Sequence, residues 1–175
     1  MALVWGYDGV GWTTTDEGVQ TSTGIAFAFN DDNGASITAV GSGSVSTGYL
    51  YISNWNLATA AKMAVYSAAG SLLGVSDPVA SGVGTGLIAF NFSSPVAILS
   101  GTRYFTYIIP NTNYIDVRTN NAFAGFSVNN SAITYASPEA SLPSPSLGNY
   151  KPFINWLDAG GGGGGGSAPV SWIRA

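Results

Sequence analysis

Residues 24–34, GIAFAFNDDNG, decide the fold predicted for this chain. Ile25, Phe27 and Phe29 alternate with small residues, which places three large apolar side chains on one face of a β-strand. The Asn33-Gly34 pair that follows is a strong signal for a tight hairpin turn. We therefore expect a strand over 25–29 and its return strand over 36–40.

The same pattern continues along the chain. Gly, Pro, Asn and Ser recur about every 8–12 residues and separate short segments rich in Val, Ile, Tyr, Phe and Thr, which is typical of an antiparallel β-sandwich or barrel. A tight three-residue turn is expected at Ala68-Ala69-Gly70, and residues 56–62 are interpreted as a loop rather than a helical turn. Further strands are expected at 47–53, 63–67, 71–75, 87–92, 102–109, 114–118 and 131–135.

The chain divides into four parts. The sandwich is expected over 20–137, preceded by a Gly-rich N-terminal arm over 1–19 whose Trp5 and Trp12 are predicted partner-docking residues. Residues 138–159 contain prolines in a Ser-rich stretch, which favours an extended path, and then an apolar patch. Two interpretations of that patch stay open, a last strand closing the domain or an interface segment.

Residues 160–175 form the fourth part, a glycine tether with a docking tip. Seven consecutive glycines contribute no side chains to a core, and each loses much backbone entropy on ordering. The tip beyond them carries Val170, Trp172 and Ile173, and tryptophan is strongly enriched at binding hot spots. We expect the tip to dock on a partner; the alternative is a low-complexity or fusion-derived tail.

The composition excludes several classes of protein. Charged residues make up 8% of the chain, against roughly 25% in an average soluble protein. The five cations are scattered and the net charge is −4, which argues against nucleic acid and anionic membrane surfaces as partners. No cysteine is present, no apolar stretch approaches the roughly 18 residues of a membrane helix, and the start of the chain lacks the features of a signal peptide.

The sequence offers no catalytic constellation. It contains no histidine, so neither a Ser-His nor a Cys-His nucleophile system can be built, and no imidazole is available to bind a metal. Most acidic residues stand beside turn formers, which explains them without catalysis. We predict no enzymatic activity and no cofactor. Asp31 and Asp32, before the expected turn, are a weak calcium candidate through their hard oxygen ligands.

A sugar-binding surface is the alternative to a docking protein. Trp55 lies in an expected loop, where an exposed ring would stack on a sugar face. Asn54 and Asn56 beside it would supply hydrogen bonds. This arrangement predicts a possible carbohydrate site at one end of the sandwich, and glycans as partners.

Two further segments carry a family resemblance. MAVYSAAGSLLG at 63–74 and IAFNFSSPVAILSGTRY at 88–104 share a hairpin followed by an F-x-F-x-x-P-V ladder. The pattern, over about residues 36–120, resembles jelly-roll β-sandwich modules of bacteriophage virion proteins and bacterial surface proteins. The resemblance implies an all-β, antiparallel jelly-roll-like sandwich with extended N- and C-terminal arms, whose end loops bind sugars or calcium or whose faces hold subunits together.

We therefore expect a virion structural protein of a tailed bacteriophage. The expected role is a capsid decoration (cement) protein, on the virion exterior after assembly in the host cytoplasm. Its partners would be the major capsid protein or other virion subunits and its own copies, with a trimer as the expected oligomer. The alternative is an extracellular carbohydrate-binding or adhesion module of a tail fibre or bacterial surface protein.

Overall fold

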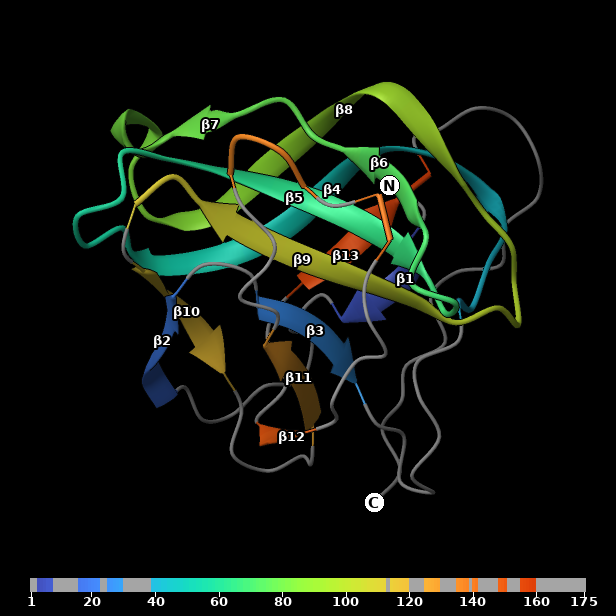
Figure 1. The fold of residues 1–175 in the computed structure, drawn as a ribbon, viewed down its shortest axis with the longest axis horizontal. Helices are drawn as coiled ribbons and strands as arrows, with labels where there is room; N and C mark the ends of the chain where they lie inside the picture. Colours follow the sequence, from blue (N-terminus) through green and yellow to red (C-terminus); the bar gives the residue numbers. More distant parts are fainter. Residues whose placement is uncertain are drawn as a thin grey trace.

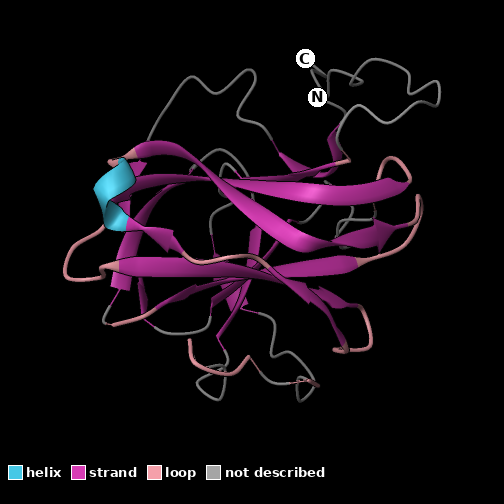
Figure 2. Ribbon diagram, turned by 90° about the horizontal axis from the view of Figure 1, so that it is seen from above, coloured by secondary structure: helices cyan, strands magenta, loops and turns pink. Residues whose placement is uncertain are grey.

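The computed structural model shows two antiparallel β-sheets packed face to face (Figure 1 and Figure 2). It contains no α-helix among the residues that it describes, only the short 3-10 turn η1 (Ser81–Val83). The described residues are 3–7, 16–22, 25–29, 39–112, 114–119, 125–129, 135–138, 140–141, 148–150 and 155–159. The strands are β1 (Leu3–Tyr7), β2 (Asp16–Ser22), β3 (Ile25–Phe29), β4 (Gly43–Asn54), β5 (Ala60–Ser67), β6 (Leu72–Val75), β7 (Val79–Ala80), β8 (Gly86–Ile98), β9 (Tyr104–Pro110), β10 (Tyr114–Thr119), β11 (Gly125–Asn129), β12 (Gly148–Tyr150) and β13 (Asn155–Asp158).

Sheet A is built around the long strand β4. Its order is β1-β13-β4-β10-β2, and β8 pairs with the other side of β4 along nearly its whole length. Sheet B has the order β12-β11-β3-β9-β5-β6, with β7 on the end of β5. Every strand pair described is antiparallel, which confirms the predicted all-β antiparallel class; the jelly-roll connectivity stays a prediction.

The main core lies between the two sheets. Along β8, Ile88, Phe90 and Phe92 are buried while the residues between them are exposed. Successive side chains of a strand point to opposite faces of its sheet, so one face of β8 lies on the core and the other faces solvent. Opposite them, Met63 and Ile108 of sheet B are also fully buried in the same apolar cluster. This F-x-F spacing is the part of the sequence pattern that positions sheet A on the core.

Several predicted strands and one turn are confirmed. The strand over 25–29 is β3, and the ranges at 47–53 and 87–92 lie inside β4 and β8. The turn at Ala68-Ala69-Gly70 joins β5 to β6, with Gly70 at φ 83° and its N–H donating to the Ser67 carbonyl at 2.9 Å. Glycine suits this left-handed position because it has no Cβ to clash.

The hairpin predicted after β3 is wrong. β9 pairs with one side of β3 and β11 with the other, so 36–40 is not its return strand. A strong local turn signal does not decide which strand becomes the neighbour, because pairing depends on the whole sheet. Of the strand predicted over 131–135, only Tyr135 is described, and it lies outside any strand.

Both ends of the chain contribute to sheet A. β1 lies in the predicted N-terminal arm but pairs with β13, so the sheets extend beyond the range 20–137 predicted for the sandwich. β13 comes from the apolar patch before the glycines and inserts between β1 and β4, with Leu157 fully buried. This result confirms the interpretation of the patch as a closing strand.

Candidate functional site

The loops at one end of the sandwich form a rigid structure around Trp55. Trp55 is 6% exposed, and its indole Nε1 donates to the Gly84 carbonyl at 2.6 Å, linking the β4–β5 loop to the loop after η1. The prediction that Trp55 is an exposed sugar platform is therefore wrong. Its apolar ring gains more from joining the core than from exposure, and the neighbouring carbonyl satisfies its one donor.

The asparagines beside Trp55 hydrogen-bond to each other. Asn54 Nδ2 donates to Asn56 Oδ1 at 3.0 Å, and the Asn56 backbone N–H donates back to Asn54 Oδ1 at 3.0 Å. This reciprocal pair holds Asn56 at φ 50°, a left-handed conformation that asparagine tolerates better than most residues. The two side chains thus shape the loop, and with Trp55 buried they do not flank an aromatic platform.

Asn111 fixes the next stretch of the same loop. Its Oδ1 accepts from the N–H groups of Thr59 and Ala60 at 3.0 and 3.1 Å, and its Nδ2 donates to Thr59 Oγ1 at 2.7 Å. Thr112 Oγ1 also donates to the Leu57 carbonyl at 3.0 Å. Side chains from the far end of β9 therefore hold the β4–β5 loop in one shape.

Exposed apolar side chains lie on this rigid support. Leu57 is 73% exposed and Val83 is 60% exposed; we call these two residues the first end patch. The bond between Trp55 and the Gly84 carbonyl holds their loops together. Because exposed leucine costs free energy in water and the polar network leaves the loop little freedom to bury it, the patch is suited to contact a partner.

A second pair of exposed apolar residues lies at the opposite end of the same strands. Val40, 53% exposed, precedes β4, and Leu99, 61% exposed, follows β8; these residues are the second end patch. The Gly101 N–H donates to the Ala39 carbonyl at 2.8 Å, which ties the two loops together. Because β4 has 12 residues, the two end patches are about 35 Å apart.

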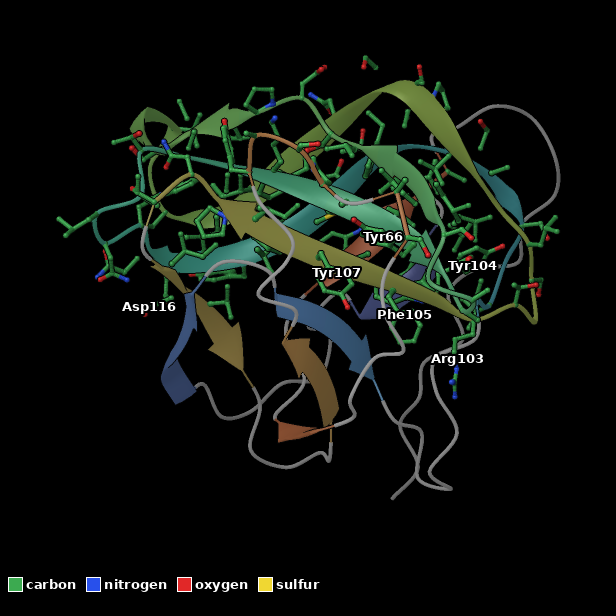
Figure 3. The ribbon with its side chains drawn as sticks, in the orientation of Figure 1. Tyr66, Arg103, Tyr104, Phe105, Tyr107 and Asp116 are labelled. Carbon is green, nitrogen blue, oxygen red and sulfur yellow. The ribbon has the colours of Figure 1, made fainter. Side chains whose placement is uncertain are left out.

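The outer face of sheet B is apolar and covered. Tyr66, Phe105 and Tyr107 are among its buried residues, in a cluster separate from the main core. Figure 3 shows Tyr66 and Tyr107 side by side on β5 and β9, with ring centres 5.2 Å apart in an edge-to-face contact. Within the described part of the chain the Tyr107 hydroxyl has no hydrogen-bond partner. Burial, together with the neighbouring Tyr66, raises the pKa of Tyr107.

Part of the Pro/Ser-rich segment lies over this face (orange in Figure 1). Lys62 Nζ donates to the Tyr135 carbonyl at 3.1 Å and lies 4.4 Å from the centre of the Tyr135 ring. Farther along, the Leu72 N–H donates to the Ala140 carbonyl at 3.0 Å. Ala140 and Ser141 of the Pro/Ser-rich segment therefore lie beside the start of β6, and Tyr135, which precedes that segment, lies beside β5. The extended path expected over 138–159 stays a prediction.

The remaining predicted site residues separate into two groups. Trp5 lies in β1 and is fully buried in the main core, so its prediction as a docking residue is wrong; Val4 and Trp5 join the core despite the glycines that follow them. The others lie outside the described residues, and their roles stay predictions. They are Trp12, the calcium candidates Asp31 and Asp32, and the docking-tip residues Val170, Trp172 and Ile173.

Sequence reasoning missed both end patches. Their signal is a large apolar residue between turn formers, as with Val83 between Gly82 and Gly84. A local pattern predicts a loop at such a position but not whether its side chain is covered. Leu57 and Val40 stand in similar sequence contexts to Trp55. Only the packed structure shows that Leu57 and Val40 are exposed whereas Trp55 is buried.

Three further observations concern metal ions, membranes and known proteins. Within the described part of the chain, no group of three or more acidic, histidine or cysteine side chains is placed to hold a metal ion. No helix there is long and apolar enough to cross a membrane. No family model, curated protein or solved structure matches the chain.

Proposed function

We propose that this protein is a non-enzymatic virion structural protein of a tailed bacteriophage, a decoration protein that stabilises junctions between capsid subunits. The observation that carries the proposal is the pair of apolar end patches on one rigid, charge-poor sandwich. A body with contact surfaces about 35 Å apart at its two ends is suited to bridge neighbouring subunits.

The contribution of the patches can be approximated from their side chains. Fully burying a leucine or valine contributes about 1.5–3 kcal/mol. Leu57 and Val83 at one end, and Val40 and Leu99 at the other, would therefore contribute a few kcal/mol per end. Such contacts are weak singly and strong when several copies bind a symmetric lattice, because avidity multiplies them. This is why we also propose a homo-oligomer, with a trimer as the expected form.

The test is occupancy on capsid particles assembled without the protein. Replacing Leu57 and Val83 together by serine should lower the affinity of the protein for the particles at least about tenfold. The double replacement of Val40 and Leu99 by serine should have the same effect. Leu73→Ser is the matched control, because Leu73 is 41% exposed on β6 and belongs to neither patch. Full occupancy by both double variants, or absence of the protein from purified virions, would contradict the proposal.

The tip at 170–173 is the second expected anchor. A chain lacking residues 160–175 should bind the same particles less tightly than the full chain, because the tip supplies Trp172 and Ile173. Unchanged occupancy would mean that the end patches alone hold the protein. That result would remove the anchoring role of the tip and leave the structural role intact.

A further inference from the structure

Among the strands that the structure describes, none pairs with the outer edge of β8. β8 has 13 residues against 12 for β4, and within the described part of the chain β4 is the only strand that pairs with it. β8 is therefore an edge strand of sheet A, with one side on β4. Strand edges of this kind offer unpaired N–H and C=O groups to any extended chain.

One hydrogen bond shows which backbone groups face outward. The Asp77 N–H, which lies outside the sheet, donates to the Asn91 carbonyl at 2.8 Å. Backbone direction alternates along a strand, and the pairing of β8 with β4 continues without a shift from Asn91 to Gly86. The N–H and C=O groups of Leu87 and Ala89 therefore also point away from β4, whereas those of Ile88 and Phe90 point toward it.

The first half of this edge lacks the usual protection against strand addition. Proteins commonly protect open edges with charged residues, prolines or bulges. Pro95 and the irregular register between Asn91 and Val96 protect the second half of β8 in this way. Between Gly86 and Asn91 the strand has no charge and no proline, and its register with β4 is regular. The Leu87 side chain on it is 49% exposed. A second segment laid along Gly86–Asn91 would keep copies of the chain from pairing there.

We propose that the tip Val170–Ile173 of the same chain adds to the β8 edge in the free protein. Val, Trp and Ile all favour β-structure, and the tip residues would match the outward-facing groups of Leu87 and Ala89, which lie before the Asn91 carbonyl that Asp77 already binds. The inference goes beyond the proposed function, because it concerns the protein before any assembly.

The charges along the edge and the tip are complementary. Asp77 is exposed at the Asn91 end of the edge and is the only charged residue from 76 to 98. Arg174 is the only charged side chain from 159 to 175 and directly follows the apolar tip residues. Placing Arg174 beside Asp77 brings Val170 to the apolar Leu87 end, so the added strand runs parallel to β8.

The tether has the length that this placement needs. Asp158, Thr47 and Asn91 lie in one row across β13, β4 and β8. With strands about 4.8 Å apart and about 3.3 Å per residue, the Leu87 end of an added strand lies about 20 Å from Ala159. A glycine-rich chain of ten residues, 160–169, has an r.m.s. end-to-end distance of about 16–19 Å. Because the average reach of the tether matches the distance to the edge, the effective concentration of the tip at the edge is in the millimolar range. This favours the tip of the same chain over that of a second copy.

Amide hydrogen exchange tests the proposal on the isolated protein. In the full chain the N–H groups of Leu87 and Ala89 should exchange at least about tenfold more slowly than in a chain ending at residue 159. The N–H groups of Ile88 and Phe90 bond to β4 and should exchange equally slowly in both, which reports that the truncated chain is folded. Equal exchange of Leu87 and Ala89 in the two chains would overturn the proposal.

A charge exchange gives a second, independent measurement. Asp77→Lys should reduce the protection of Leu87 and Ala89 by up to about fivefold, and Asp77→Lys with Arg174→Asp should restore it. No restoration would overturn the parallel orientation. Protection that rises with protein concentration, together with dimers in light scattering, would assign the edge to the tip of a second copy and overturn the intramolecular placement. Neither outcome bears on capsid occupancy, so the proposed function is tested separately.

Discussion

Replacing Tyr107 by phenylalanine should stabilise this protein. The Tyr107 side chain is fully buried on the outer face of sheet B, and its hydroxyl has no hydrogen-bond partner among the residues that the structure describes. In the unfolded chain the same hydroxyl is hydrated, so folding loses that hydration without replacing it. The cost of leaving a buried polar group unpaired is about 1–3 kcal/mol. Phenylalanine removes the cost and keeps the edge-to-face contact with Tyr66.

Tyr104 provides the matched control on the same strand. It is 4% exposed, and its hydroxyl accepts a hydrogen bond from the Leu99 N–H at 2.9 Å. The same substitution there deletes a formed hydrogen bond and leaves a backbone donor unpaired, which should cost about 1 kcal/mol. The two Tyr→Phe variants are therefore expected to change the free energy of unfolding in opposite directions, although they remove the same atom.

Urea unfolding followed by circular dichroism gives both values. We expect the free energy of unfolding of Tyr107→Phe to rise by at least about 1 kcal/mol, with Tm about 2–4 °C higher. Tyr104→Phe should lower both quantities. A loss of stability in Tyr107→Phe equal to that in Tyr104→Phe would refute the reasoning, because it would mean that a buried water or another group binds the Tyr107 hydroxyl.

Three further predictions concern stability. Burial raises the pKa of Tyr107 above its ordinary value of 10.0, so the unfolded chain loses this proton at a lower pH than the folded chain does. The contribution of Tyr107 to the free energy of unfolding is therefore complete below about pH 10 and falls above it by up to about 1.4 kcal/mol per pH unit. Tyr107→Phe should reduce this loss in alkaline urea titrations. Gly48→Ala should cost about 1–3 kcal/mol in the same assay, because a Cβ there meets the Met63 sulfur in the core; an unchanged midpoint would show that Met63 moves aside freely. Trp55→Phe should cost about 1 kcal/mol through loss of the bond to the Gly84 carbonyl, and a neutral result would mean that water replaces the indole there.

The sequence predicted strands well where the alternation of side chains is regular. Ile25, Phe27 and Phe29 identified β3, and the F-x-F pattern of Phe90 and Phe92 identified β8 with its buried face. These predictions succeed because a strand with one buried face repeats every two residues, which a local window can detect. The apolar run before the glycines likewise became β13.

The site could not be predicted in the same way. Trp5 stands beside a glycine and Trp55 between two asparagines, and both were expected to be exposed, yet both are buried in the core. Whether an aromatic ring in a turn is covered depends on segments far away in sequence, such as Gly84 for Trp55. The open edge of β8 depends even more on distant residues, because a strand is an edge only when every other strand has found a different neighbour.

The low charge of this chain and its open edge are connected. With 8% charged residues, the chain has few lysines or glutamates to place along an exposed strand, although charge is the commonest protection against edge-to-edge association. A tethered segment of the same chain protects an edge without adding charge. It also exchanges between copies at little cost, because the contacts in the swapped and unswapped forms are identical. If the tip covers the β8 edge as proposed, we therefore expect it to stay on its own chain in dilute solution and to exchange between copies only where they are held close together.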